Sequence, residues 1–147
     1  MNKLLQKIAP LGLILLLGCL LLFHFAVISG MLPFDMIWGG QLQTQAQMIR
    51  QEIIAIAFIL VFLIVALCKA ELLPVKAPVR MINVLLWIMA VFFLLNSVAN
   101  ILSENNLERL IFTPISLLLF IFCVILARGN AARKNKISPG NTTQAPL

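Results

Sequence analysis

The sequence predicts an all-α integral membrane protein, an antiparallel bundle of four transmembrane helices. Its composition is 62% hydrophobic and 11% charged, with a mean hydropathy of +1.06. An ordinary soluble domain has about 45–50% apolar and about 25% charged residues. In addition, four apolar segments long enough to cross a bilayer alternate with short polar stretches. They leave no room for a separate soluble domain, so the predicted transmembrane domain covers residues 1–127.

The first span is predicted at residues 8–32, an apolar stretch preceded by Lys3 and Lys7. A signal peptide also begins with basic residues, but its apolar core of about 7–15 residues is shorter than this segment. The Gly18-Cys19 pair loosely resembles a bacterial lipoprotein cleavage site. A lipidated mature chain would continue into polar sequence, whereas apolar residues follow here. We interpret the segment as a retained transmembrane helix.

A polar outer loop is predicted at residues 33–48, followed by the second span at 49–70. The loop contains a tryptophan followed by two glycines and then a series of glutamines. We expect the helix of the second span to begin near Gln43 or Thr44, where the glutamine-rich stretch leads into apolar sequence. The loop is expected to pack over the mouth of the bundle.

The third and fourth spans are predicted at residues 81–102 and 107–127. Two prolines in residues 71–80 prevent a regular helix there, so this segment is a short connection. The polar residues 103–106 make a tight turn between the last two spans. Pro114 lies near the start of the fourth span, where a missing backbone N–H is tolerated best.

Basic residues predict how the bundle is oriented. Residues 128–147 form a polar, basic tail without periodicity, which we expect to be disordered. Four spans place both termini on one side, and by the positive-inside rule the side with more basic residues is cytoplasmic. Only Arg50 and Arg109 lie on the other side. The basic residues on the side of the termini are Lys3, Lys7, Lys69, Lys76, Arg80, Arg128, Arg133, Lys134 and Lys136.

Several function classes are disfavoured by the sequence. The net charge of +6 comes from basic residues placed singly or in short groups beside the spans, which does not indicate nucleic-acid binding. The chain has no nucleophile elbow, HExxH motif or phosphate loop. It has a single histidine, which gives little support for a metal site. We therefore expect no enzyme activity, no metal and no cofactor. Cys19, Cys68 and Cys123 lie in three different spans, and we expect them to be buried as small hydrophobic side chains.

Polar side chains inside the spans are the candidate functional residues. A charge at the bilayer centre costs about 2.5–3.5 kcal/mol, so each polar group there needs a partner. Asn96 and Asn100 are four residues apart and share one helix face. Asn83 lies toward the inner side, whereas the other polar residues belong to the outer half. The candidate ligand-binding residues, including the tryptophan of the outer loop, are His24, Trp38, Glu52, Asn96 and Asn100.

Two interpretations of these residues remain open. In the first, the polar groups hydrogen-bond one another and determine how the four helices pack, each contact contributing about 0.6 kcal/mol. In the second, His24 and Glu52 form a proton-exchanging or ligand-binding site that is reached from outside, because ionisable residues within a membrane are candidates for function. The sequence does not show which helix faces meet.

The region from Phe23 to Leu126 resembles an uncharacterised family of small four-span bacterial integral membrane proteins. The residues that carry this resemblance are His24, Gly30, Pro33, Trp38-Gly39-Gly40, Glu52, Asn96, Asn100 and Phe112-Thr113-Pro114. The resemblance implies an all-helical fold in a bacterial cytoplasmic membrane. It implies no activity.

The function predicted from the sequence is that of a non-enzymatic, multi-pass membrane protein. Its expected partners are the lipid bilayer and either a partner protein, a lipid or a small lipophile, with no nucleic acid. The alternative is a transporter-like or proton-linked protein with an outer-half polar site at His24 and Glu52. Four spans are few for a translocation path, so this alternative predicts an oligomer.

Overall fold

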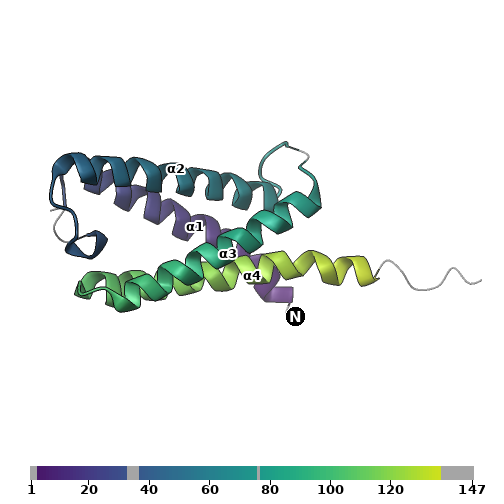
Figure 1. Cartoon of the computed structure of the whole chain (residues 1–147). Helices are drawn as coiled ribbons and strands as arrows, with labels where there is room; N and C mark the ends of the chain where they lie inside the picture. The colour runs from purple at the N-terminus through teal and green to yellow at the C-terminus, as the bar shows by residue number, and fades with distance from the viewer. Residues whose placement is uncertain (1–2, 33–36, 76, 137–147) are drawn as a thin grey trace, which may run out of the picture.

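The chain folds into four long antiparallel helices (Figure 1). The computed structural model describes residues 3–32, 37–75 and 77–136. The helices are α1 (Lys3–Ile28), α2 (Gln45–Lys69), α3 (Val79–Leu102) and α4 (Thr113–Lys136), with a 3₁₀ turn η2 (Trp38–Gly40) and a π-helical turn η3 (Glu108–Phe112). The described ranges contain no strand. The predicted all-α fold is confirmed.

Each long helix carries a segment that is long and apolar enough to cross a membrane. In these four segments no more than 33% of the most apolar window is buried inside the bundle. The remaining apolar side chains face outward and cover the exterior, a surface that suits lipid and not water. The fold is therefore a bundle of four candidate membrane spans, as predicted.

The two ends of the bundle hold different elements of the chain. One end holds η2, the start of α2 and the turn between α3 and α4; we call it the loop end. The other end, which we call the terminal end, holds the start of α1 and the end of α4 (Figure 1). The connection between α2 and α3 also lies at the terminal end.

Helix α1 ends at Ile28, before the predicted boundary at residue 32. The N–H of Gly30 donates to the carbonyl of Val27, and the N–H of Met31 donates to the carbonyl of Ala26. This pair of bonds closes the helix with Gly30 in the left-handed region, at φ 78°. The apolar run continues beyond the helix, so hydropathy alone placed the boundary too late.

Helix α2 begins at Gln45, directly after the predicted start at Gln43 or Thr44. The Thr44 hydroxyl accepts a hydrogen bond from the N–H of Gln47 at 3.3 Å and caps the helix. The helix therefore includes the last residues of the predicted outer loop, 33–48. Residues 33–36 of that loop lie outside the described residues.

The C-terminus of α2 uses the same closing motif as α1, but with a glutamate at the left-handed position. The N–H of Glu71 donates to the carbonyl of Cys68, and the N–H of Leu72 donates to that of Leu67. Glu71 has φ 59°, a conformation that strains a residue with a Cβ. Pro78 then precedes α3, which starts at Val79, two residues earlier than predicted.

A π-helical turn precedes α4 where proline would interrupt a regular helix. Pro114 has no N–H, and in a regular helix its ring would clash with the carbonyl four residues earlier. The chain adds one residue to the turn at Glu108–Phe112, which rotates the preceding residues by about 100° relative to a regular helix. Pro114 is therefore accommodated within a continuous helical segment.

Helix α4 extends to Lys136, which corrects the prediction of a disordered tail from residue 128. The segment after Gly129 contains alanine, arginine and lysine, which are strong helix formers, and elongation of an existing helix needs no new nucleus. Residues 137–147 of the predicted tail lie outside the described residues.

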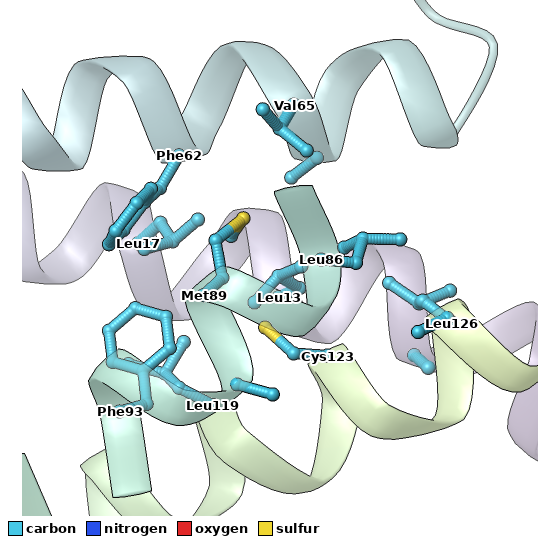
Figure 2. Close-up of a cluster of buried hydrophobic side chains, with 14 of the residues drawn as sticks. Leu13, Leu17, Phe62, Val65, Leu86, Met89, Phe93, Leu119, Cys123 and Leu126 are labelled. Carbon is cyan, nitrogen blue, oxygen red and sulfur yellow. The ribbon is translucent and has the colours of Figure 1, made fainter. Parts of the chain in front are cut away.

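The apolar core is shared by all four helices (Figure 2). Its fully buried side chains include Leu13, Leu17, Leu86, Met89 and Leu119. Helices α1 and α2 pack along each other, as do α3 and α4, and α1 also packs on α4. Helices α2 and α3 meet much less.

The three cysteines do not share one environment. Cys123 is fully buried in the core, as predicted, and Cys68 packs partly buried against the core. Cys19 is exposed on α1, so the prediction that it is buried was wrong. A thiol on an outward face is compatible with lipid, because it behaves as a small hydrophobic group.

Substitutions at Gly30, after α1, and at Glu71, after α2, should change the free energy of unfolding in opposite directions. Glu71→Gly should raise the free energy of unfolding by about 0.5–1 kcal/mol, because glycine adopts a positive φ without a steric penalty. Gly30→Ala should lower it by a similar amount, since its neighbourhood has space for a methyl group and only the backbone opposes it. Thermal unfolding in detergent measures both. Shifts in the same direction for the two variants would contradict the proposed strain at Glu71.

Candidate functional site

A fully buried carboxylate forms the centre of the site. Glu52 lies two turns into α2, where the Thr44 cap sets the start of the helix. It shares a helix face with Met48, one turn earlier, and both side chains are buried. Burying a carboxylate costs free energy unless hydrogen bonds compensate it. The hydrogen-bond partners of Glu52 therefore define the site.

Both oxygens of Glu52 have a partner. His24 Nδ1 lies 2.6 Å from Glu52 Oε2, and Trp38 Nε1 donates to Glu52 Oε1 at 2.7 Å. The histidine comes from α1 and the tryptophan from η2, so the carboxylate joins three separate elements.

The backbone of η2 brings the indole to Glu52. Trp38, Gly39 and Gly40 all have positive φ, at 55°, 66° and 71°. Two of these positions are glycines, which adopt this region freely, whereas Trp38 is held there under strain. Such strain persists where surrounding contacts determine the conformation, and it is frequent at functional sites.

The same turn is held from its other side by Glu108. The N–H of Gly39 donates to Glu108 Oε1 at 2.8 Å. Ile37, just before the turn, is buried in a small cluster with Val27 and Met48. The loop is therefore attached to α1, α2 and η3 together, and the prediction that it packs over the mouth of the bundle is confirmed for its described residues.

Asn96 and Asn100 join α3 to α4. Their Nδ2 atoms both donate to the Ser116 hydroxyl oxygen, at 2.9 and 3.2 Å. Ser116 is buried, Asn100 is half-buried and Asn96 is exposed. The first of the two open interpretations, in which the asparagines act as interhelical polar contacts, agrees with this geometry. In the part of the chain that the structure describes, no hydrogen bond links them to Glu52.

The residues around Glu52 and the residues around Ser116 line one cavity of about 370 Å³. All five predicted residues, His24, Trp38, Glu52, Asn96 and Asn100, line it. Glu108, Ser116 and Gln51 complete its polar wall at the loop end. Deeper in the bundle its wall is apolar and aromatic, formed by Phe58, Phe62, Phe92, Phe93 and Leu119.

The cavity opens between α2 and α3. Phe58 of α2 stacks on Phe92 of α3 with ring centroids 5.8 Å apart, which closes the bundle at that level. Nearer the loop end, Ile54 of α2 and Asn96 of α3 line the cavity and are also exposed on the outside of the bundle. In Figure 1 these helices approach each other at the terminal end and diverge toward the loop end.

Asn83 lies apart from the site. Its Oδ1 accepts a hydrogen bond from Lys69 Nζ at 3.3 Å, which connects α2 and α3 at the terminal end. This placement agrees with the prediction that Asn83 belongs to the other half of the bundle.

Glu108 and Ser116 were missed by the sequence analysis. A serine within a helix often satisfies its hydroxyl on its own backbone, so Ser116 gave no signal. Glu108 was not among the predicted site residues, and only the fold shows that it accepts a hydrogen bond from Gly39.

The comparisons with known proteins add no assignment. No protein-family model, curated protein or solved structure matches the chain. Among the described residues, no group of three or more His, Cys, Asp or Glu side chains is placed to hold a metal ion.

The shared acceptor on Ser116 predicts energetic coupling between α3 and α4. Asn96→Ala and Ser116→Ala should each lower the thermal stability, and the double variant should lose less than their sum. The expected coupling is about 0.6 kcal/mol, the average for hydrogen bonds between membrane helices. Ser29→Ala is the matched control, because that hydroxyl is exposed and donates only to the nearby carbonyl of Ala26, at the end of α1. Strictly additive effects of the two substitutions would rule out the contact.

Proposed function

We propose that this protein is a non-enzymatic integral membrane protein that binds a lipid or small lipophile in the cavity at its loop end. The observation that carries the proposal is the cavity itself, which has polar groups at the loop end and aromatic walls below. Its volume of about 370 Å³ falls within the range of about 300–1,000 Å³ that is usual for small-molecule sites.

The division of the cavity wall matches an amphiphile. The carboxylates and amides at the loop end suit a polar head group, and the phenylalanines suit an apolar tail. Because the opening between α2 and α3 faces the membrane, a lipophile can enter sideways from the bilayer without crossing water.

A binding role explains the site better than catalysis does. His24 and Glu52 resemble a base and its orienting carboxylate, which a catalytic site would combine with a nucleophile. Among the described residues, no serine, threonine or cysteine hydrogen-bonds His24. The carboxylate of Glu52 has one partner on each oxygen, which suits a structural and recognition role.

The proposal places the protein in a bacterial cytoplasmic membrane with both termini in the cytoplasm. The basis is the excess of lysine and arginine at the terminal end, together with the family resemblance. In this orientation the loop end and the cavity lie in the outer half of the membrane. A tag at either end that is detected from outside intact cells would contradict this orientation.

A substitution that fills the cavity tests lipophile binding. Native mass spectrometry of the protein released gently from its own membrane should show an additional bound mass on the wild type. Ala55→Trp should remove this mass, because Ala55 lines the cavity. Ala57→Trp, an exposed position two residues further along the same helix, should retain it. Bare protein in all three samples would refute the proposal, and a bound protein subunit would indicate a protein partner instead.

A second candidate function is proton-linked transport, favoured by the short contact between His24 and the buried Glu52. The two groups hold a proton between them, and the cavity offers it a route toward the loop end. This candidate also requires an oligomer, since four spans make a small translocation path.

Proton movement across liposomes tests this alternative. Wild-type protein should dissipate an imposed pH gradient, reported by an internal pH-sensitive dye, and Glu52→Gln should abolish that activity. Glu104→Gln, an exposed acid in the nearby turn, is the control and should behave as the wild type. Equal dissipation by wild type and Glu52→Gln would exclude a proton-carrying role for Glu52.

A further inference from the structure

We propose that the lipophile carries a protonated amine, and that Glu108, Asn96 and Asn100 bind this head group. The inference rests on the proposed function and adds the chemical class of the ligand. It follows from the charge and the hydrogen-bonding capacity of the cavity wall.

The polar wall of the cavity has a net negative charge. Glu52, Glu108 and His24 are its only ionisable side chains among the described residues. If His24 is protonated, it neutralises Glu52, and the charge of Glu108 remains. If His24 is neutral or the proton lies on Glu52, the wall is still negative, because Glu108 has no cationic partner in the described part of the chain.

The two basic residues at the loop end, Arg109 and Arg50, do not compensate Glu108. Arg109 points elsewhere, since its guanidinium donates to Asn106 Oδ1 at 3.0 Å, and it does not line the cavity. Arg50 lies near the start of α2 but is likewise absent from the lining. A bound cation would therefore meet an unbalanced carboxylate, whereas an anionic head group would be repelled.

The wall also offers hydrogen-bond acceptors. Asn96 and Asn100 each donate an N–H to Ser116, and their amide oxygens remain as acceptors. Glu108 uses Oε1 for the Gly39 N–H and has a second oxygen available. An alkylammonium head has three N–H donors and no acceptor, which complements this set.

The aromatic wall accounts for the rest of the ligand. Phe58, Phe62 and Phe93 line the deeper part of the cavity, where they provide an apolar surface for an alkyl chain. The opening between α2 and α3 lets a longer chain continue into the bilayer. Charge, acceptors and apolar surface together select an amine-bearing lipophile over a fatty acid or a phospholipid with an anionic head.

Binding of three matched amphiphiles tests the inference. Decylammonium, decanol and decanoate share one alkyl chain and differ in head-group charge. Each is titrated into the full-length protein in phosphatidylcholine nanodiscs, and the fluorescence of Trp38 is followed in a Trp87→Phe background. Decylammonium should bind at least tenfold more tightly than the other two. Ala55→Phe, which fills the same cavity without adding a second tryptophan, should weaken all three, which shows that the signal comes from the cavity.

Two substitutions that change the charge of the cavity wall in opposite directions test whether that charge causes the preference for decylammonium. Glu108→Gln should remove the tenfold preference, and its amide oxygen can still accept the Gly39 N–H, so the loop contact is preserved. Gln51→Glu adds a carboxylate at an exposed position of the lining and should increase the preference several-fold. Glu104→Gln, outside the cavity, should change nothing.

The outcomes separate the ligand class from the binding function. Equal binding of the three probes, all weakened by Ala55→Phe, would overturn the amine proposal and leave lipophile binding standing. A preference for decylammonium that survives Glu108→Gln would reject the assigned head-group site. Absence of binding by every probe would overturn the amine proposal and count against the proposed function as well.

Discussion

The buried carboxylate of Glu52 is the interaction on which the loop end of this bundle depends. A carboxyl group taken out of water must find hydrogen-bond partners, and here one comes from α1 and the other from η2. Because both partners are distant in sequence, satisfying one side chain determines how a helix, a turn and a second helix meet. The strained backbone of Trp38 lies in the turn that carries its indole to Glu52.

The bundle consists of two helix pairs that are held together differently along their length. Toward the terminal end, apolar side chains from all four helices interlock (Figure 2), and Lys69 reaches Asn83 across α2 and α3. Toward the loop end, α2 and α3 diverge (Figure 1), and polar contacts are added within each pair. Glu52 holds α2 to α1, whereas Ser116 holds α4 to α3. The cavity lies where neither set of contacts joins α2 to α3.

The loop and the π turn connect these two pairs at their open end. Gly39 bonds Glu108, so η2 bridges from the α1–α2 pair to the start of α4. The additional residue in the turn before Pro114 rotates Glu108 relative to the rest of α4. One carboxylate therefore anchors the loop and remains at the polar end of the cavity, which gives the site its excess of negative charge.

The sequence alone determined the fold class and the approximate spans, because hydropathy, caps and breakers act locally. It also identified His24, Glu52, Asn96 and Asn100, since polar groups in lipid are costly wherever they lie. Only the tertiary structure decided what these residues contact. The end of α1 depended on a hydrogen-bond motif at Gly30 within an apolar run, and the partners Ser116 and Glu108 depended on which helix faces meet. Four apolar helices can be packed in several ways, so the cavity, which side chains from all four helices line, arises from their arrangement and cannot be predicted from any one segment.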